Sequence, residues 1–372
     1  MSLRILLTTL SFLSWSYIAI DAFGLETVAP VASSAVNKVA VAGATGRTGS
    51  LVVQELLDRN VNVVALVRDL EKANQSLPIN DEKLSVLQSD LSNEDQILSS
   101  VDGCDAAIWA ATGFSDNPDN TWLVKIKKLL GVALTPRKTI DAVGIPALAK
   151  CFPENGSDDV NMPKVVMLSS AGVTRPMWEE SKKEQFIGAA DIPIVRLNPF
   201  GILDIKADSE ENLRKSGTKY CIVRPCGLND NWPTDSRPVF SQGDVAVGRI
   251  NRKDVARILV DCLYTPEAEG KTFECFTLQG YQPALSIDKS LSVLYKDSDG
   301  LPEAVVAANY ALLQQLLPGE KQDSAALAMG QTYEQLDKDE QGRFGQRGTE
   351  DAEGAIGGEL NPQKVETQTS VA

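Results

Sequence analysis

The sequence predicts an α/β fold with a doubly wound, mostly parallel sheet. An apolar run at residues 39–42 enters a glycine-rich turn at 43–49, and a helical apolar pattern follows at 50–57. Further short apolar runs alternate with helical segments as far as residue 277, which is the order of elements in parallel sheets joined by helices. Several runs are apolar throughout, as expected of strands that are covered on both faces.

Seven strands are expected along the chain. They lie at residues 39–42, 61–67, 84–87, 106–110, 164–168, 220–223 and 271–277. Right-handed crossover connections place them in the Rossmann order 3-2-1-4-5-6, with the seventh strand at the edge.

Helical patterns lie between these strands. The main expected helices cover residues 50–57, a segment that opens at 92, and residues 139–149 and 254–263. Ser92 and Asp95 have the spacing of a capping box, which predicts the start of the second helix. Pro146 lies inside the third helix and predicts a kink there.

The chain divides into four parts. Residues 1–36 are expected to be a presequence, 37–283 the sheet domain, 284–317 a helical extension and 318–372 a tail. The region after the last strand is expected to form a small substrate-binding or lid region. Because the tail is rich in Gly, Gln and Glu and poor in apolar residues, we expect an acidic, largely disordered segment with at most one helix, near 324–336.

Composition excludes several classes of function. The net charge of the 372-residue chain is −14, which argues against nucleic acid or an anionic membrane as the main partner. The chain has no histidine, which excludes Ser-His and Cys-His catalysis and metal sites with histidine ligands. Its six cysteines form no C-x-x-C pair. We expect reduced, mostly buried thiols and no metal site.

The N-terminus has the layout of a targeting sequence. Arg4 precedes an apolar run at 5–20 that Ser and Thr interrupt, and the small residue Ala22 follows. This is typical of a signal peptide, and the run is too short and too polar to predict a spanning helix. The junction Asp-Ala-Phe-Gly at 21–24 resembles the two-part presequences of algae with complex plastids, in which 23–37 would be a transit peptide. We therefore expect import into the plastid stroma and no stable membrane span in the mature chain. The secretory pathway and a retained membrane anchor are the alternatives.

The turn at 43–49 predicts a dinucleotide-binding site. Gly43 suits a tight turn off the strand, where a Cβ would clash. Gly46 lets the backbone approach a pyrophosphate, and Gly49 lets the helix pack against the sheet. The amides and the dipole of that helix would face the phosphates.

The end of the second strand decides between the two nicotinamide dinucleotides. An acidic side chain there binds a ribose 2′-hydroxyl, whereas an arginine accommodates a 2′-phosphate. Arg68 follows the strand, and Arg47 in the turn could reach the same phosphate. These two residues favour NADP. Asp69 is one residue away and can bind a hydroxyl, so NAD is the alternative.

Several motifs together resemble one protein family. They are Val-Ala-Gly-Ala-Thr-Gly-Arg-Thr-Gly at 41–49, Leu-Val-Arg-Asp at 66–69 and Ser-Asp-Leu at 89–91, with further agreement at 141–144, 168–171 and 220–225. Over about residues 37–280 the chain resembles the atypical short-chain dehydrogenase/reductases, in their NmrA-like branch. The stretch from 196 to 226 is similar to plastid and cyanobacterial members linked to photosystem biogenesis.

The resemblance implies a set of site residues. The pyrophosphate would be held by Gly43, Thr45, Gly46, Arg47, Thr48 and Gly49. Around the adenosine, the resemblance implies Arg68 at the 2′-phosphate, Asp90 and Leu91 at the adenine, and Ala110, Ala111 and Thr112 at the adjoining ribose. At the reactive end it implies Ser170 as the catalytic serine, Lys206 as the lysine of a Tyr-x-x-x-Lys pair that bonds the nicotinamide ribose, and Pro225 as a further cofactor-binding residue.

One position departs from the family pattern. Ile202 stands four residues before Lys206, where the family has a tyrosine. A carbonyl reductase of this class needs that phenol to donate a proton to the developing alkoxide. Isoleucine cannot do so, and Tyr220 is expected on a buried strand. Ketone reduction by the usual mechanism is therefore not expected. Hydride transfer to an activated alkene or a conjugated ring remains possible, because its proton can come from water or from the substrate.

Competing functions follow from these observations. The first is an NADPH-dependent oxidoreductase that acts on a small conjugated or electrophilic, pigment-like substrate. The second is a nucleotide-bound scaffold, or a redox-sensing assembly factor for a photosynthetic complex, without turnover. A signal-anchored lumenal protein is a third alternative.

Overall fold

The computed structural model describes residues 36–111, 140–153, 161–190, 192–198, 201–281 and 283–316. All of them belong to one of the two units into which contacts divide the chain, Ser34–Ala372. The expected presequence, the helix near 324–336 and the acidic tail lie outside the described residues.

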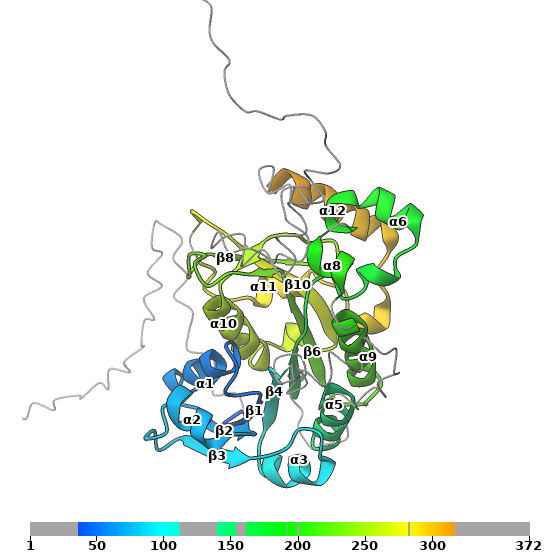
Figure 1. Cartoon of the computed structure of the whole chain (residues 1–372). Coiled ribbons are helices and arrows are strands. Elements are labelled where there is room, and N and C mark those ends of the chain that lie inside the picture. Colours follow the sequence, from blue (N-terminus) through cyan, green and yellow to red (C-terminus); the bar gives the residue numbers. More distant parts are fainter. Residues whose placement is uncertain are drawn as a thin grey trace, which may run out of the picture. The chain divides into compact units, whose positions relative to one another are not determined.

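An eight-stranded sheet forms the centre of the described chain (Figure 1). Its strands are β1 (Lys38–Ala42), β2 (Asn62–Val67), β3 (Leu84–Gln88), β4 (Ala106–Trp109), β5 (Val165–Leu168), β6 (Tyr220–Pro225), β8 (Arg237–Ser241) and β10 (Lys271–Leu278). They run in the order β3-β2-β1-β4-β5-β6-β10-β8, so the predicted Rossmann order is confirmed for the first six. Only β8 is antiparallel to its neighbour, β10. A small second sheet pairs β7 (Gly227–Leu228) with β9 (Arg249–Ile250).

Helices cover both faces of this sheet (Figure 1). On one face α1 (Gly49–Asp58) and α10 (Arg252–Leu263) share a core cluster with the central strands. On the other, α3 (Glu94–Val101), α5 (Ile140–Lys150) and α9 (Ile202–Arg214) contribute to a second cluster. The remaining helices are α2 (Leu70–Ser76), α6 (Glu180–Gln185), α7 (Ile187–Ala190), α8 (Pro193–Leu197), α11 (Asp288–Ser292), α12 (Glu303–Leu316) and the short η2 (Arg175–Met177), η4 (Pro266–Ala268) and η5 (Asp297–Asp299). The described chain is therefore doubly wound, as predicted.

The carboxyl ends of the parallel strands lie along one edge of the sheet. Ala42 at the end of β1 is opposite Leu66 on β2 and Trp109 on β4. Leu168 at the end of β5 is opposite Val223 on β6. The segments that follow these strands therefore leave the sheet at the same edge, which is where sheets of this type bind their ligands.

The structure corrects two predictions about elements. Strand β8 was not predicted, and it lies at the edge where the seventh predicted strand was expected. Its segment is short and contains Pro238, which an edge strand tolerates because only one side of it pairs. The cap of α3 is Asn93, whose side chain accepts a hydrogen bond from the Gln96 amide at 3.2 Å. The hydroxyl of Ser92 instead donates to Asp90 at 2.7 Å.

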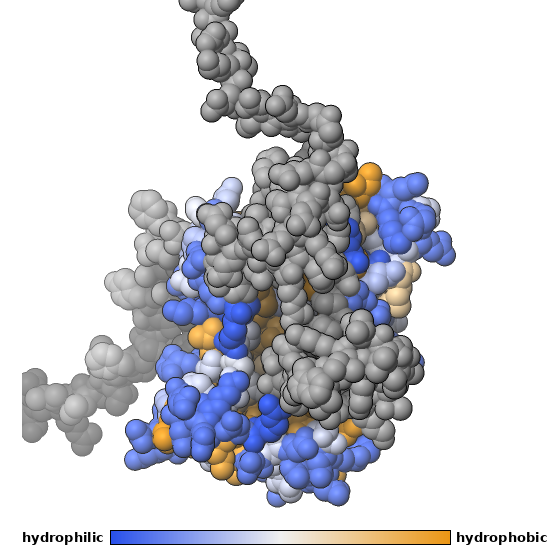
Figure 2. Space-filling model, viewed as in Figure 1, coloured by the Kyte–Doolittle hydropathy of each residue, from blue (hydrophilic) through white to orange (hydrophobic). Residues whose placement is uncertain are grey.

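One face of the described chain can be judged from its hydropathy. Figure 2 shows that hydrophilic residues make up most of the coloured surface on one face, with apolar residues in separate patches. Within the part of the chain that the structure describes, no helix combines the length and apolar character needed to span a bilayer.

Candidate functional site

The glycine turn joins β1 to α1 in the predicted geometry. Gly43 has a φ of +78°, in the left-handed region that favours glycine. The Gly46 amide donates to the Gly43 carbonyl at 2.9 Å and closes the turn. Helix α1 then begins at Gly49 with no side-chain cap and no acidic residue in its first turn. A helix N-terminus of this kind is suited to a phosphate group.

Gly49→Ala is expected to destabilise the protein, although alanine is favoured over glycine by about 1 kcal/mol inside helices. The new Cβ would lie 2.1 Å from the carbonyl oxygen of Gly43, and this backbone atom cannot rotate away. We expect a loss of about 1–3 kcal/mol in urea unfolding, together with weaker binding of a dinucleotide at the turn. Gly188→Ala in α7 is the matched control, because its Cβ would come no closer than 3.6 Å to another atom. Equal stability of the two variants would contradict the close-approach role of Gly49.

The ends of β2 and β3 bring together residues expected at the adenosine. Hydrogen bonds from Ser92 lower the pKa of Asp90, and the nearby charge of Arg68 adds to this effect. Leu91 follows as a half-buried side chain. Asp69 is used differently: its carboxylate accepts from two first-turn amides of α2, at 2.9 and 3.1 Å. Asp69, the residue that favoured NAD, therefore caps helix α2.

The end of β4 lies against the glycine turn. The Ala110 amide donates to the Ala42 carbonyl at 2.9 Å. A Cβ on Gly43 would lie 2.6 Å from Cα of Ala111. Both alanines are buried. Thr112, the third residue expected at the ribose, lies outside the described residues.

The ends of β5 and β6 adjoin each other. The Ser170 hydroxyl donates to the Ala171 carbonyl at 3.0 Å. The Ala171 amide donates in turn to the Pro225 carbonyl, also at 3.0 Å. The structure therefore brings Ser170 and Pro225 to neighbouring positions at the carboxyl edge.

Lys206 lies on α9, one turn after Ile202. Burial lowers the pKa of Lys206, while the charges of Asp141 and Glu210 oppose that shift. Ile202 is the first residue of α9, so the position of the missing phenol is occupied by an aliphatic side chain.

Tyr220 does not replace the missing phenol. It begins β6, at the amino end of the strand, and so lies at the opposite edge of the sheet from Pro225. Its hydroxyl donates to Asp297 at 3.0 Å. Burial and the Asp297 charge raise the pKa of Tyr220.

A buried ionic cluster lies at the carboxyl ends of β5 and β6. Glu210 on α9 is 1% exposed, and it accepts hydrogen bonds from Arg224 at 2.5 and 2.9 Å. Ser169 donates to the same carboxylate at 2.5 Å, and Arg214 donates at 2.9 Å. Burial alone would raise the pKa of Glu210, but the charge and hydrogen bonds of Arg224, together with the charge of Arg214 and the hydrogen bond from Ser169, lower the pKa. This cluster fixes α9, and with it Lys206, against the sheet.

Glu274 on β10 adjoins this cluster without joining it. Its side chain is 1% exposed, and its Oε1 lies 4.0 Å from Nη1 of Arg224. Among the described residues, neither oxygen has a hydrogen-bond partner of normal geometry. Burial, followed by the charge of Asp244, raises the pKa of Glu274 to about 7.

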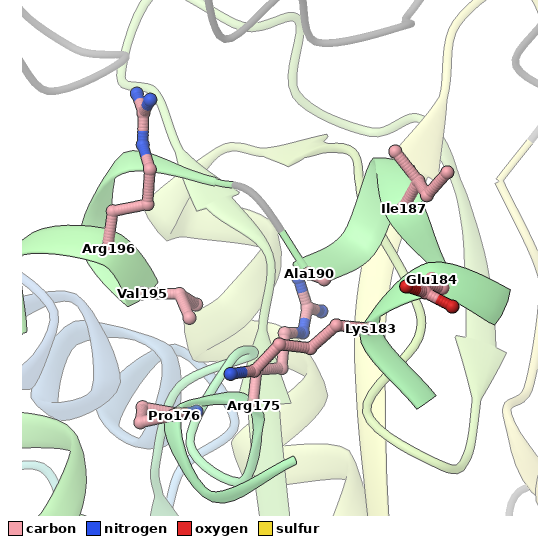
Figure 3. A pocket seen from close by; sticks show the side chains of 8 residues that line it. All are labelled: Arg175, Pro176, Lys183, Glu184, Ile187, Ala190, Val195 and Arg196. Atoms are coloured by element: carbon pink, nitrogen blue, oxygen red, sulfur yellow. The ribbon is translucent and has the colours of Figure 1, made fainter. Parts of the chain in front are cut away.

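A cavity of about 470 Å³ lies beside the segment that follows β5 (Figure 3). Its lining residues are Arg175, Pro176, Lys183, Glu184, Ile187, Ala190, Val195 and Arg196. In Figure 3 the Lys183 side chain extends across Arg175 toward Pro176. A Cβ on Gly172 would lie 3.1 Å from Val195, and Gly172 follows Ser170 by two residues. The cavity therefore lies near Gly172, in the segment that follows β5, and has the size of a small-molecule site.

Sequence reasoning missed the ionic cluster and the cavity. A signal for the cluster was present: Arg224 interrupts the otherwise apolar β6, and a buried arginine requires an acidic partner. Glu210 and Arg214 also have the i, i+4 spacing of a helical ion pair. The cavity has no comparable local signal.

Comparisons with known proteins agree with the interpretation of the glycine turn, because the matching family model begins at Gly43. A family model described as NAD(P)H-binding matches residues 43–266. An uncharacterised chloroplast protein of Arabidopsis thaliana is 32% identical over 240 residues, which cover 64% of this chain and 76% of the relative. The chloroplast protein TIC 62 of Pisum sativum is 28% identical over 218 residues, covering 54% of this chain and only 34% of TIC 62. A solved structure of a candidate NAD-dependent epimerase/dehydratase from Bacillus halodurans is 21% identical with a TM-score of 0.49, covering 69% of this chain and 99% of that one.

Proposed function

The chain belongs to the NAD(P)H-binding family of NmrA-like Rossmann proteins, and on this premise we propose that it is an NADP(H)-dependent oxidoreductase of the plastid. Its substrate would be a small conjugated or electrophilic molecule. The proposed cofactor contacts are those that the resemblance implied, from the glycine turn to Lys206 and Pro225.

The preference for NADP rests on the different uses of two neighbouring residues. Asp69 accepts hydrogen bonds from two backbone amides of α2 through one oxygen, Oδ1, which holds its carboxylate at the start of that helix. Arg68 lies close enough to Asp90 to lower its pKa, which puts a cation beside the position expected for the adenosine. A cation at this strand end favours a 2′-phosphate over a hydroxyl.

Arg68→Ala is expected to weaken NADPH binding at least tenfold and to leave NADH binding nearly unchanged. The reason is the loss of one charge-assisted contact to the 2′-phosphate, worth roughly 1.5–3 kcal/mol. Titration of the purified protein with both nucleotides measures the effect. Arg237→Ala, on the exposed side of β8, removes the same charge away from the site and should change neither affinity. Equal affinity of the unaltered protein for NADH and NADPH would contradict the proposed preference.

The proposed reaction is hydride transfer to a conjugated acceptor. Bound NADPH would supply the hydride, and Lys206 would hold the nicotinamide ribose. No phenol stands at 202 to protonate an alkoxide, so we assign the proton to water, which can protonate a conjugated acceptor after the hydride has arrived. The cavity near Gly172 is the proposed place for the acceptor, since Gly172 follows Ser170 by two residues.

A non-catalytic role is the second candidate, and Ile202 is the observation that favours it. A scaffold or redox-sensing assembly factor needs the nucleotide site but no proton donor. Single-turnover oxidation of bound NADPH by quinone and enone acceptors distinguishes the two. Tight NADPH binding without oxidation by either class supports the scaffold.

We propose plastid localisation because both relatives named above are chloroplast proteins. The proposed organisation is a presequence at 1–36, the dinucleotide domain at 37–283, a helical extension at 284–317 and an acidic tail at 318–372. Sequencing of the mature N-terminus tests the presequence.

A further inference from the structure

Arg47 of the glycine turn is held by a carboxylate from a distant part of the chain. Its Nη2 lies 3.1 Å from Oδ2 of Asp230, and the two residues are 183 positions apart in the sequence. Both side chains are about half exposed, 58% for Arg47 and 48% for Asp230. A phosphate that entered the site could therefore reach this ion pair from solvent.

Asp230 is fixed in place from α10. Its other oxygen, Oδ1, accepts a hydrogen bond from Arg252 at 2.6 Å. Its backbone carbonyl accepts from the Asn251 side chain at 2.9 Å, and Asn251 also binds the Trp232 carbonyl at 2.7 Å. Asn251 is itself the cap of α10. The carboxylate is thus presented to Arg47 by a segment that is anchored at two points.

Asp230 is shared between two cations, so Arg47 can leave it at low cost. If Arg47 turned to a phosphate, Asp230 would keep its hydrogen bond to Arg252, so the Asp230 carboxylate would stay paired with a cation. While Arg47 stays on Asp230, a phosphate must compete with that carboxylate for the guanidinium. It must also approach a negative charge.

We propose that Asp230 sets the affinity of the site for the phosphates of the dinucleotide by competing with them for Arg47. This inference rests on the proposed function, because it assumes that the turn at 43–49 binds a dinucleotide. The competing phosphate is the 2′-phosphate or the pyrophosphate. Both present the same chemistry to Arg47, and the two cofactors separate them.

Asp230→Asn is expected to strengthen NADPH binding two- to fivefold, the range that corresponds to loss of one exposed ion pair. The amide keeps the shape of the side chain and an acceptor for Arg252. Asp235→Asn is the matched control: it removes the same charge from a neighbouring exposed carboxylate, which pairs with Arg257 rather than Arg47. The control should not change NADPH affinity by more than the measurement error. Thermal unfolding without nucleotide checks that both variants fold.

The double variant Arg47→Ala/Asp230→Asn isolates the competition. If Asp230 acts through Arg47, Asp230→Asn has no effect once Arg47 is absent. If Asp230→Asn raises the affinity for NADPH alone, Arg47 contacts the 2′-phosphate. If it raises the affinity for NADH equally, Arg47 contacts the pyrophosphate. An unchanged NADPH affinity in Asp230→Asn, or a gain that persists without Arg47, overturns the inference and leaves the proposed function standing. Failure of the unaltered protein to bind either nucleotide overturns both.

Discussion

Arg224→Met is expected to destabilise the protein by about 3–5 kcal/mol, the range for removing one partner of a buried ion pair. Glu210 is 1% exposed and takes two of its hydrogen bonds from Arg224. Ser169 and Arg214 would still donate hydrogen bonds to the carboxylate. Of these two only Arg214 is charged, so Glu210 would face one positive charge instead of two. Urea unfolding near pH 8 measures the loss.

A second substitution shows whether the loss comes from the stranded carboxylate. Arg224→Met/Glu210→Leu removes both charges, so most of the stability lost in the single variant should return. Lys150→Met is the control for an exposed pair: Lys150 and Glu94 are 61% and 45% exposed, so we expect a change of at most about 1 kcal/mol. An equally small effect of Arg224→Met would show that the cluster does not contribute to stability.

The cluster also links stability to the proposed chemistry. Glu210 and Lys206 lie one turn apart on α9, and Ser169 and Arg224 each precede a predicted site residue, Ser170 and Pro225. Because the ion pair fixes α9 on the sheet, it also fixes the position of Lys206. The buried ion pair therefore contributes to the geometry of the neighbouring candidate site.

The fold could be predicted because its signals are local. Apolar runs such as 61–67 identify buried strands, and the spacing of Gly43, Gly46 and Gly49 identifies the strand–turn–helix unit. The right-handed crossover connections between parallel strands then give the order of the strands in the sheet. Strand β8 escaped prediction because an edge strand is buried less and needs no continuous apolar run.

The candidate site was predictable only where its contacts are close in sequence or carried by a motif. The turn residues could be predicted from their glycine motif, and Arg68 from its position directly after the second strand. The pair of Arg47 and Asp230 could not be found in this way, because an exposed arginine and an exposed aspartate have no pattern that marks them as partners across 183 residues. The capping role of Asp69 depends on where α2 begins, which sequence reasoning places only to within a few residues.

Glu274 is expected to make the protein less stable as the pH rises from about 4.5 to about 7. Burial and the nearby charge of Asp244 raise its pKa from 4.5 to about 7 in the folded protein, and the charges of Arg224 and Arg175 only partly oppose them. Between these two values the folded state holds a proton that the unfolded state has lost, so stability falls with rising pH. The difference between the two pKa values corresponds to a loss of about 3 kcal/mol in the free energy of unfolding, which is complete above pH 7. At low pH this contribution is absent, because both states are then protonated.

Glu274→Gln keeps the size of the side chain and removes its titration. Relative to the unaltered protein, the variant should gain about 3 kcal/mol of stability between pH 4.5 and pH 8, measured by urea unfolding at several pH values. Taking the difference cancels the titration of groups that do not interact with Glu274. Glu180→Gln, at a residue whose side chain is 83% exposed, should differ from the unaltered protein by less than about 0.5 kcal/mol throughout. If the difference in stability between Glu274→Gln and the unaltered protein does not change with pH, the carboxylate is ionised in the folded state even at pH 5. The charges of Arg224 and Arg175 would then outweigh the cost of its burial, and Glu274 would be a full member of the ionic cluster that holds α9.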